Sequence, residues 1–256
     1  MIQGFKPNIE RIESIADLFF HSFKDSYYTR SLLGDIRRSF LLDTLVLPVI
    51  KKYPHLCIVS KDKDNINGAA LFSNTYTEVS EIDAIPGCNG FGILLYICVD
   101  EQARKQGIGS ALITEVENHL KHNGVDGMRV TCESTNKAAN VLYKKNGYQL
   151  KKQTVLHQGE ASVLRQANGK SSISKNQGKK DGLLYHTCEK RGESTVMVIK
   201  PSLKASYEDI TSLLAGKAYD IAEVYVPVGE SGMREQLTGI GCKEILINNV
   251  YIKKWG

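Results

Sequence analysis

The sequence predicts an α/β fold of the α+β kind, in which helices cover a β-sheet. The first observation is residues 94–148, where an apolar strand at 94–99 and another at 128–132 each run into an amphipathic helix. The second observation is the order of elements ahead of this segment, which reads strand, helix, helix, strand, strand. The third is a fainter β-α-β-α-β pattern near the C-terminus, which predicts a second half-copy of the same unit.

The N-terminal third contains the early elements. Ile12, Ile15 and Phe19 recur at helical spacing, so we expect a helix there. Pro48 is expected to kink or end a second helix early, because proline donates no backbone hydrogen bond. Residues 61–65 have the composition of a hairpin turn. The expected elements are a strand at 1–5, helices at 9–23 and 33–52, strands at 55–60 and 67–74, and a loop at 78–89.

A basic loop that contains glycine joins the strand at 94–99 to the next helix. Arg104, Gly107 and Gly109 give this loop the order R-x-x-G-x-G. Glycine lets a backbone approach a ligand closely, and the first N–H groups of a helix have no partner inside it, so the loop suits a phosphate. A tight turn is the alternative interpretation. The Walker pattern G-x-x-x-x-G-K-[ST] is absent, and Leu112 interrupts the dinucleotide pattern G-x-G-x-x-G.

Residues 94–148 resemble the core of the GNAT superfamily of acyl-CoA-dependent N-acyltransferases. The R-x-x-G-x-G loop matches the loop that binds the CoA pyrophosphate in that family, and the following segment matches its N-x-x-A…L-Y-x-x-x-G-[FY] pattern. The N-terminal third matches only in the order of its elements. The matching residues are Ile97, Cys98, Val99, Asp100, Arg104, Gly107, Gly109, Asn136, Ala139, Leu142, Tyr143, Gly147 and Tyr148.

The resemblance implies a mixed, mostly antiparallel sheet that is splayed at a central pair of parallel strands, and it implies acetyl-CoA as the cosubstrate. Backbone groups of residues 97–99 would bind the pantetheine arm and polarise the thioester carbonyl. Amides of residues 105–110 would hold the pyrophosphate, and Asn136 would contact the CoA arm and cap the second helix. The implied cofactor-binding residues are Ile97, Cys98, Val99, Arg104, Lys105, Gln106, Gly107, Ile108, Gly109, Ser110 and Asn136.

The resemblance also assigns Tyr143 as the catalytic residue, which would give a proton or a hydrogen bond to the CoA sulfur. A phenol stays protonated at neutral pH, which fits a donor. The alternative interpretation of Tyr143 is a core aromatic on one face of a helix. The residue that deprotonates the amine is left open, and a chain of water molecules is a further option. The candidates are Glu81, Asp83, Glu133 and His157.

The expected reaction transfers an acetyl group directly to a primary amine of a small-molecule or peptide acceptor, without a covalent enzyme intermediate. Cys98 and Cys132 are close enough to the site in sequence to be examined as nucleophiles. Tyr27 and Tyr28 are candidates for the acceptor wall, with an ordinary core or surface position as the alternative. The other functions left open are a non-catalytic acyl-CoA-binding or sensing module and a nucleic-acid-binding protein.

Composition restricts the class of protein. The formal net charge is +5, but four lysines and one aspartate fall within residues 166–182, which indicates a solvated linker rather than a face for nucleic acid. No apolar run is long enough to span a membrane and the first residues lack a signal-peptide pattern, so we expect a cytoplasmic protein without a membrane partner. Six scattered cysteines without C-x-x-C predict reduced, mostly buried thiols and neither a disulfide nor a metal site.

After the central segment, a strand is expected at 149–157, a turn at Gly159, and a short segment at 161–165 that pairs back. The polar composition of residues 166–182 is typical of an exposed linker. These features divide the chain into an acyltransferase domain at 1–165, a flexible basic linker or loop at 166–182, and a degenerate related domain at 183–256.

An offset of 94 residues superposes the C-terminal half-copy on the first copy without a gap and places Gly147 on Gly241. The alternative is a chance alignment of two α/β segments. The second copy is expected to extend the sheet, cover the acceptor site or form a homodimer interface. Its elements are expected as helices at 206–217 and 231–239 and strands at 222–226, 244–247 and 250–254.

The second copy lacks the residues of the phosphate loop. At the same offset, Arg104, Gly107 and Gly109 fall on Val198, Pro201 and Leu203. Proline has no N–H to offer, and leucine places a side chain where the backbone should face phosphate. We therefore expect one CoA site in the chain, in the first copy.

Overall fold

The computed structural model describes most of the chain, namely residues 1–4, 9–23, 26, 56–75, 85–88, 90–168, 184–191, 194–202 and 204–255. We call residues 1–168 the first half and residues 184–255 the second half. The expected helix at 33–52 and most of the expected linker at 166–182 lie outside the described residues. The candidates Tyr27, Tyr28, Glu81 and Asp83 also lie outside them.

In its described residues, the first half contains most of the predicted elements in the predicted order. The strand at its start, the helix at 9–23 and the central strand–helix–strand–helix segment are all present. The elements are β1 (Ile2–Gly4), α1 (Ile9–Phe23), β2 (Cys57–Asp62), β3 (Asn65–Ser73), β4 (Gly92–Val99), the short 3-10 helix η3 (Glu101–Ala103), α5 (Ile108–His122), β5 (Gly127–Glu133), α6 (Lys137–Lys145), β6 (Gln149–Glu160) and α7 (Ala161–Asn168).

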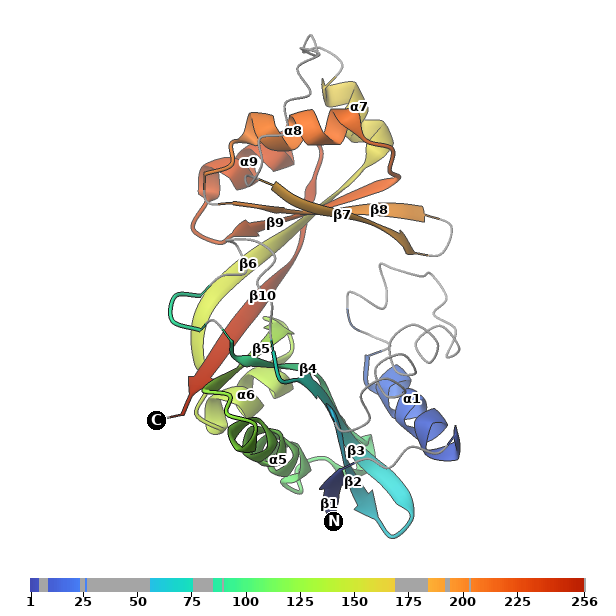
Figure 1. Ribbon diagram of the computed structural model, residues 1–256. Helices are drawn as coiled ribbons and strands as arrows, with labels where there is room; N and C mark the ends of the chain where they lie inside the picture. Colours follow the sequence, from blue (N-terminus) through green and yellow to red (C-terminus); the bar gives the residue numbers. More distant parts are fainter. Residues whose placement is uncertain are drawn as a thin grey trace.

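The second half is built from strands and helices in alternation after an initial hairpin. Its elements are β7 (Leu184–Arg191), β8 (Ser194–Pro201), α8 (Tyr207–Gly216), β9 (Ile221–Pro227), α9 (Ser231–Gly239) and β10 (Lys243–Lys254). Figure 1 shows this half stacked above the first half, with α7, α8 and α9 on its outer side.

All ten described strands form one sheet in the order β1-β2-β3-β4-β5-β10-β6-β9-β8-β7. The pairs β4–β5 and β8–β9 are parallel, and the other neighbouring pairs are antiparallel. The predicted mixed, mostly antiparallel sheet with a parallel central pair is therefore confirmed. In the first half, α1 covers one face of the sheet, and α5 and α6 cover the other (Figure 1).

The two halves exchange a strand, which the sequence did not predict. The second half's last strand, β10, lies between β5 and β6, and it pairs with β5 from Asn248 to Lys254. In return β6 lies between β10 and β9, and it pairs with β9 from Thr154 to Glu160. Both long strands run through the junction of the halves (Figure 1). The sheet of each half is therefore completed by a strand of the other.

Side chains lock β10 into the first half. Lys253 Nζ lies 2.8 Å from Oε2 of Glu117, a carboxylate on α5 that is 5% exposed. Tyr148 donates a hydrogen bond to the other oxygen of Glu117 at 2.9 Å. Trp255 donates its backbone N–H to the carbonyl of Asp126 at 3.1 Å. These contacts tie the C-terminal strand to the helix that follows the phosphate loop.

The elements repeat at the predicted offset over most of the second half. β9 and α9 begin and end 94 residues after β5 and α6. The strand pairing repeats as well, because Thr154 pairs with Pro227 and Asn248 pairs with Glu133. That the second half is a degenerate copy of the first stays a prediction, as does the division at 165 and 183. The structure adds that β6 and β10 serve both halves.

The offset of 94 residues fails at β8, so the prediction of a repeat without a gap is wrong there. Leu94 pairs with Val130, 36 residues later, whereas Ile199 pairs with Val224, only 25 residues later. The second half is thus eleven residues shorter between its parallel strands. Val198 and Pro201 belong to β8 and are not counterparts of the phosphate loop, whose place in the second half is taken by a shorter connection.

Three further sequence expectations are wrong. Residues 161–165 form the start of helix α7 rather than a returning strand, and Gly159 is no turn, because it pairs with Ala222 inside β6. A Cβ on Gly159 would lie 3.0 Å from Cys242 Sγ, so glycine serves close packing there. Residues 244–247 and 250–254 belong to one strand, since Asn248 and Asn249 are buried within β10.

Candidate active site

The parallel strands β4 and β5 separate after a short contact. They pair only from Gly92 to Leu94 on β4, although β4 continues to Val99. Leu95 is an extra residue in the pairing of β4 with β3, because Tyr96 pairs with Leu71 and Leu94 pairs with Phe72. Such a bulge bends a strand and disrupts its ladder. Among the described residues, the backbone of β4 beyond the bulge therefore has an open edge on the side of β5.

The open edge of β4 leads directly into the phosphate-type loop. Gly107 is the N-cap residue of α5, with a φ of 82°, and no side chain in the described ranges forms a capping hydrogen bond with the first N–H groups of the helix. The first turn of α5 contains no acidic residue. Uncapped N–H groups and the positive end of the helix dipole favour an anion. The start of α5 is thus available to a phosphate, and Ile108, Gly109 and Ser110 supply its first N–H groups.

The basic and polar residues of the loop have different positions. Arg104 donates from Nε to the carbonyl of Val99 at 3.2 Å, so it fastens the loop to the end of β4. Lys105 is exposed and has a φ of 63°. Gln106 donates to the carbonyl of Gln102 at 3.3 Å. The structure therefore brings the predicted loop residues together at the start of α5, with Arg104 in a bracing position.

Helix α6 is capped, in contrast to α5. Asn136 Oδ1 accepts a hydrogen bond from the N–H of Ala139 at 3.0 Å, which is the cap expected from the sequence. Its contact with a CoA arm stays a prediction. The other end of α6 is joined to the start of α5, because Asn146 Nδ2 lies 3.1 Å from Ser110 Oγ.

Tyr143 lies on α6 within the main core of the first half. It is 5% exposed, and its ring lies near those of Tyr148 and Tyr251, at centroid distances of 6.0 and 5.8 Å. Its hydroxyl makes no hydrogen bond to any residue in the described part of the chain. Burial raises the pKa of Tyr143, so the phenol keeps its proton. Tyr143 therefore lies in the core, as the alternative interpretation expected, and its phenol is protonated, as a proton donor must be.

The cysteines near the site are not activated. All six thiols of the chain are free, and Cys98 is buried beneath α1. Burial raises the pKa of Cys98 and raises that of Cys132 to about 12. A nucleophilic cysteine needs its thiolate form. The structure thus gives neither thiol the surroundings of a nucleophile.

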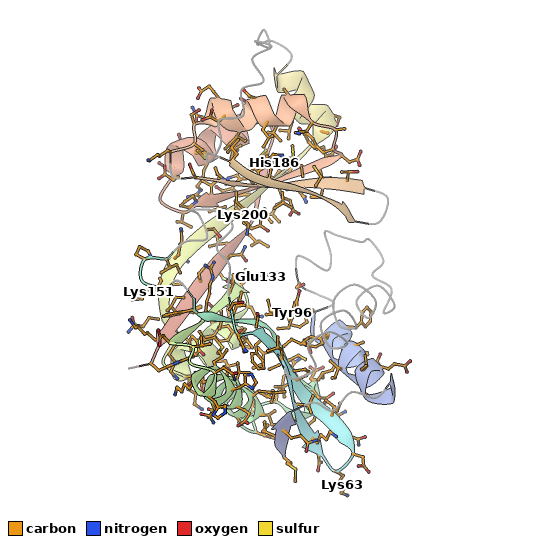
Figure 2. All side chains as sticks on the ribbon, in the orientation of Figure 1. Lys63, Tyr96, Glu133, Lys151, His186 and Lys200 are labelled. Carbon is orange, nitrogen blue, oxygen red and sulfur yellow. The ribbon has the colours of Figure 1, made fainter. Side chains whose placement is uncertain are left out.

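The two described candidates for the base, Glu133 and His157, lie in different parts of the structure. Glu133 lies at the end of β5, where the two halves meet (Figure 2). His157 lies on the α9 face of the second half, fully buried, with Nε2 3.3 Å from Glu244 Oε1. Burial lowers the pKa of His157. Of the candidates that the structure describes, Glu133 is therefore the one at the end of β5, the strand from which β4 separates.

Tyr96 and two residues of β10 near the site were missed from the sequence. Tyr96 lies on β4 next to the bulge and contacts the rings of Phe19 and Phe23 on α1 (Figure 2). Alternation along β4, which puts Tyr96 and Cys98 on the α1 face, could have found it. Asn249 and Tyr251 of β10 lie against α6 through Asn140, and no local sequence signal predicts this.

Within the described ranges no group of three or more His, Cys, Asp or Glu side chains is arranged to hold a metal ion. Likewise no described helix has the length and apolar character needed to cross a bilayer.

Known proteins share the family pattern and the fold of this chain. A model of the acetyltransferase (GNAT) family matches residues 12–148. A GCN5-related N-acetyltransferase from Sphaerobacter thermophilus is similar over 99% of this chain and 95% of that chain, with 10% identity and a TM-score of 0.59. A candidate acetyltransferase from Pyrococcus horikoshii is similar over 100% and 89%, with 13% identity and a TM-score of 0.59. A search of curated protein sequences gave no significant match.

A second archaeal structure, a candidate acetyltransferase from Thermoplasma acidophilum, covers 100% of both chains with 13% identity and a TM-score of 0.57. Identities this low show that the fold is shared and carry no information on the acceptor. The family model is different in kind, because it matches more than half of the 256 residues and includes the open edge of β4, the start of α5 and Tyr143. The chain therefore belongs to the acetyltransferase (GNAT) family.

Proposed function

We propose that this protein is an N-acetyltransferase that transfers an acetyl group from acetyl-CoA directly to a primary amine of a small molecule or peptide. The observation that carries the proposal is the continuity of the open edge of β4 with the uncapped start of α5. An extended pantetheine arm with amide groups would pair with residues 97–99 as a strand does. The pyrophosphate would then meet the N–H groups of Ile108, Gly109 and Ser110.

The reaction requires one bond to form and one to break. The amine nitrogen attacks the thioester carbonyl carbon, a C–N bond forms, and the C–S bond breaks with the electron pair on sulfur. Glu133, directly or through water, would take the proton of the amine. The Tyr143 hydroxyl would give its proton or a hydrogen bond to the departing thiolate. No covalent intermediate on the enzyme is needed, which agrees with the raised pKa values of Cys98 and Cys132.

Calorimetric titration of acetyl-CoA into the wild type and Gly107→Val tests the cosubstrate. The valine side chain would stand where the pyrophosphate approaches, so micromolar binding should be lost. Gly107 has a positive φ of 82°, so valine also strains the backbone there. Gly124→Val is the matched control, because Gly124 has a φ of 71°, has equally open surroundings and lies at the opposite end of α5. The control should bind acetyl-CoA like the wild type.

An amine panel with detection of released thiol then tests the reaction. A diamine, an amino acid and peptides with a free N-terminus or a lysine cover the acceptor classes. Binding of acetyl-CoA without turnover of any amine would favour the alternative, a non-catalytic acyl-CoA-binding or sensing module. Equal binding by the wild type and Gly107→Val would refute the placement of the pyrophosphate.

A further inference from the structure

Asn140 on α6 connects the helix to the end of β5. Its Nδ2 group lies 3.0, 3.3 and 2.7 Å from the carbonyl oxygens of Glu133, Ser134 and Asn136. An amide nitrogen can only donate, so three surrounding acceptors fix the orientation of the side chain. The amide therefore holds the backbone of Glu133 and the start of α6 together, and Oδ1 must face donors.

Two of the donors to Asn140 Oδ1 come from β10. Tyr251 Oη lies 2.7 Å from this oxygen and Asn249 Nδ2 lies 2.6 Å from it, while the thiol of Cys132 lies at 3.6 Å. The oxygen of Asn249 in turn accepts from Gln153 Nε2 at 2.8 Å. The last strand of the second half is thus bonded to the helix that carries Tyr143.

Tyr251 also confines the ring of Tyr143. Tyr251 is 1% exposed, and the two rings are tilted by 48° at a centroid distance of 5.8 Å. Asn140 precedes Tyr143 by three residues on α6, so the same strand contacts both the ring of Tyr143 and the side chain of Asn140 one turn away. A ring held in this way cannot rotate away from the site without breaking contacts to β10.

The second half has a different cluster at the corresponding places. At the offset of 94 residues, Asn140, Tyr143 and Tyr251 correspond to Arg234, Leu237 and His157. There, Arg234 Nε donates to Glu244 Oε1 at 2.8 Å, and His157 lies 3.3 Å from the same oxygen. The second half has no phenol at this position. The amide–phenol network occurs only in the half that contains Tyr143, among the residues that the structure describes.

We propose that Tyr251 and Asn249, acting through Asn140, are positioning residues for the acetyl transfer, so that the first half's active site is completed by the second half's last strand. This inference rests on the proposed function, since it takes Tyr143 as the proton donor. Through the ring contact of Tyr251 and the hydrogen bonds to Asn140, these side chains hold the Tyr143 hydroxyl in its place. The second half therefore has a role in catalysis although its own phosphate loop is missing.

The test is a double-mutant cycle between Tyr251→Phe and Tyr143→Phe. Tyr251→Phe keeps the ring and removes the hydrogen bond to Asn140, so acetyl-CoA affinity should stay unchanged. Loss of positioning should lower kcat by about 10–100-fold, because small displacements of a reacting group are costly. In the Tyr143→Phe background, Tyr251→Phe should lower kcat no further, because its effect depends on the phenol of Tyr143. Asn249→Ala should behave in the same way.

A purely structural role predicts a different result. Tyr251→Phe would then lower kcat by the same factor in both backgrounds, and that outcome overturns the inference, as does an unchanged kcat. If Tyr143→Phe alone leaves kcat unchanged, the inference also fails. Failure of the proposed function is recognised separately, because the wild type would then release no thiol with any amine of the panel.

Discussion

Tyr143 and Tyr148 belong to one aromatic cluster, yet their hydroxyls have different tasks. Their rings are 6.0 Å apart, and both side chains are buried. The hydroxyl of Tyr148 donates to Glu117 Oε1 at 2.9 Å. The hydroxyl of Tyr143 has no hydrogen bond within the described ranges. Removing the hydroxyl of Tyr143 should therefore lower the rate of acetyl transfer, and removing the hydroxyl of Tyr148 should lower the stability of the fold.

The magnitudes follow from these surroundings. Tyr143→Phe keeps both ring contacts and breaks no described hydrogen bond, so Tm should stay within about 2 °C. Loss of a general acid should lower kcat by about 10²–10⁴, or about 2.7–5.5 kcal/mol. Tyr148→Phe removes a hydrogen bond to a buried carboxylate that Lys253 still neutralises. It should cost about 1.5 kcal/mol, the low end for a charged partner, and lower Tm by about 3–6 °C.

The assay combines thermal unfolding with release of CoA thiol at saturating acetyl-CoA, with the best amine of the panel. Tyr148→Phe should keep its kcat when measured well below its Tm. Because burial raises the pKa of Tyr143, wild-type kcat should show no alkaline decline from this residue up to about pH 10. Tyr143→Phe with wild-type turnover, or both variants with the same loss of kcat, would refute the division of tasks.

Other contacts give further predictions. Lys253→Met leaves the carboxylate of Glu117 without its cation and should lower the free energy of unfolding by about 3 kcal/mol, measured with a denaturant. The control, Lys254→Met at the exposed neighbouring residue, should change it by no more than about 0.5 kcal/mol. Burial lowers the pKa of His157, so the unfolded chain takes up a proton that the folded chain resists. Stability should be complete above about pH 6.5 and fall below it, and His157→Gln should lose less stability between pH 7.5 and pH 5 than the wild type does; an equal loss would exclude His157 as its source. A chain that ends at Gly241 lacks β10, so β5 and β6 lose their shared neighbour and gel filtration should show aggregates; a soluble monomer would contradict the strand exchange.

Local patterns predicted much of this fold because most elements are decided by their own residues. The spacing of Ile12, Ile15 and Phe19 gives α1 its buried face, and all three side chains are in the core beneath β3 and β4. The bounds of α1 and α9 agree with the expected 9–23 and 231–239. The position of the loop before α5 could also be predicted, because a basic residue and glycine directly before a helix are a signal within a few residues of sequence.

The errors occurred where a distant partner decides the structure. Asn248 and Asn249 have the composition of a turn, yet in β10 their side chains are 4% and 7% exposed, and Asn249 binds Asn140 more than a hundred residues away. Gly159 continues β6 because β9 pairs with it. The partners of β6 and β10 depend on register across the junction, and neither strand's own sequence specifies that choice.

The strand exchange also explains why the fold needs the second half, although that half lacks the residues expected to bind CoA. A sheet does not need a phosphate loop. The connection after β8 is eleven residues shorter than the one after β4, and β8 still pairs with β9. Leu237, at the position that corresponds to Tyr143, is fully buried in the second core. Strand β10 cannot be lost in the same way, because it fills the space between β5 and β6 and bonds to Asn140. The second half therefore contributes a strand that the first half's sheet needs, and that strand is bonded to the helix that carries Tyr143, where we propose that it positions the phenol.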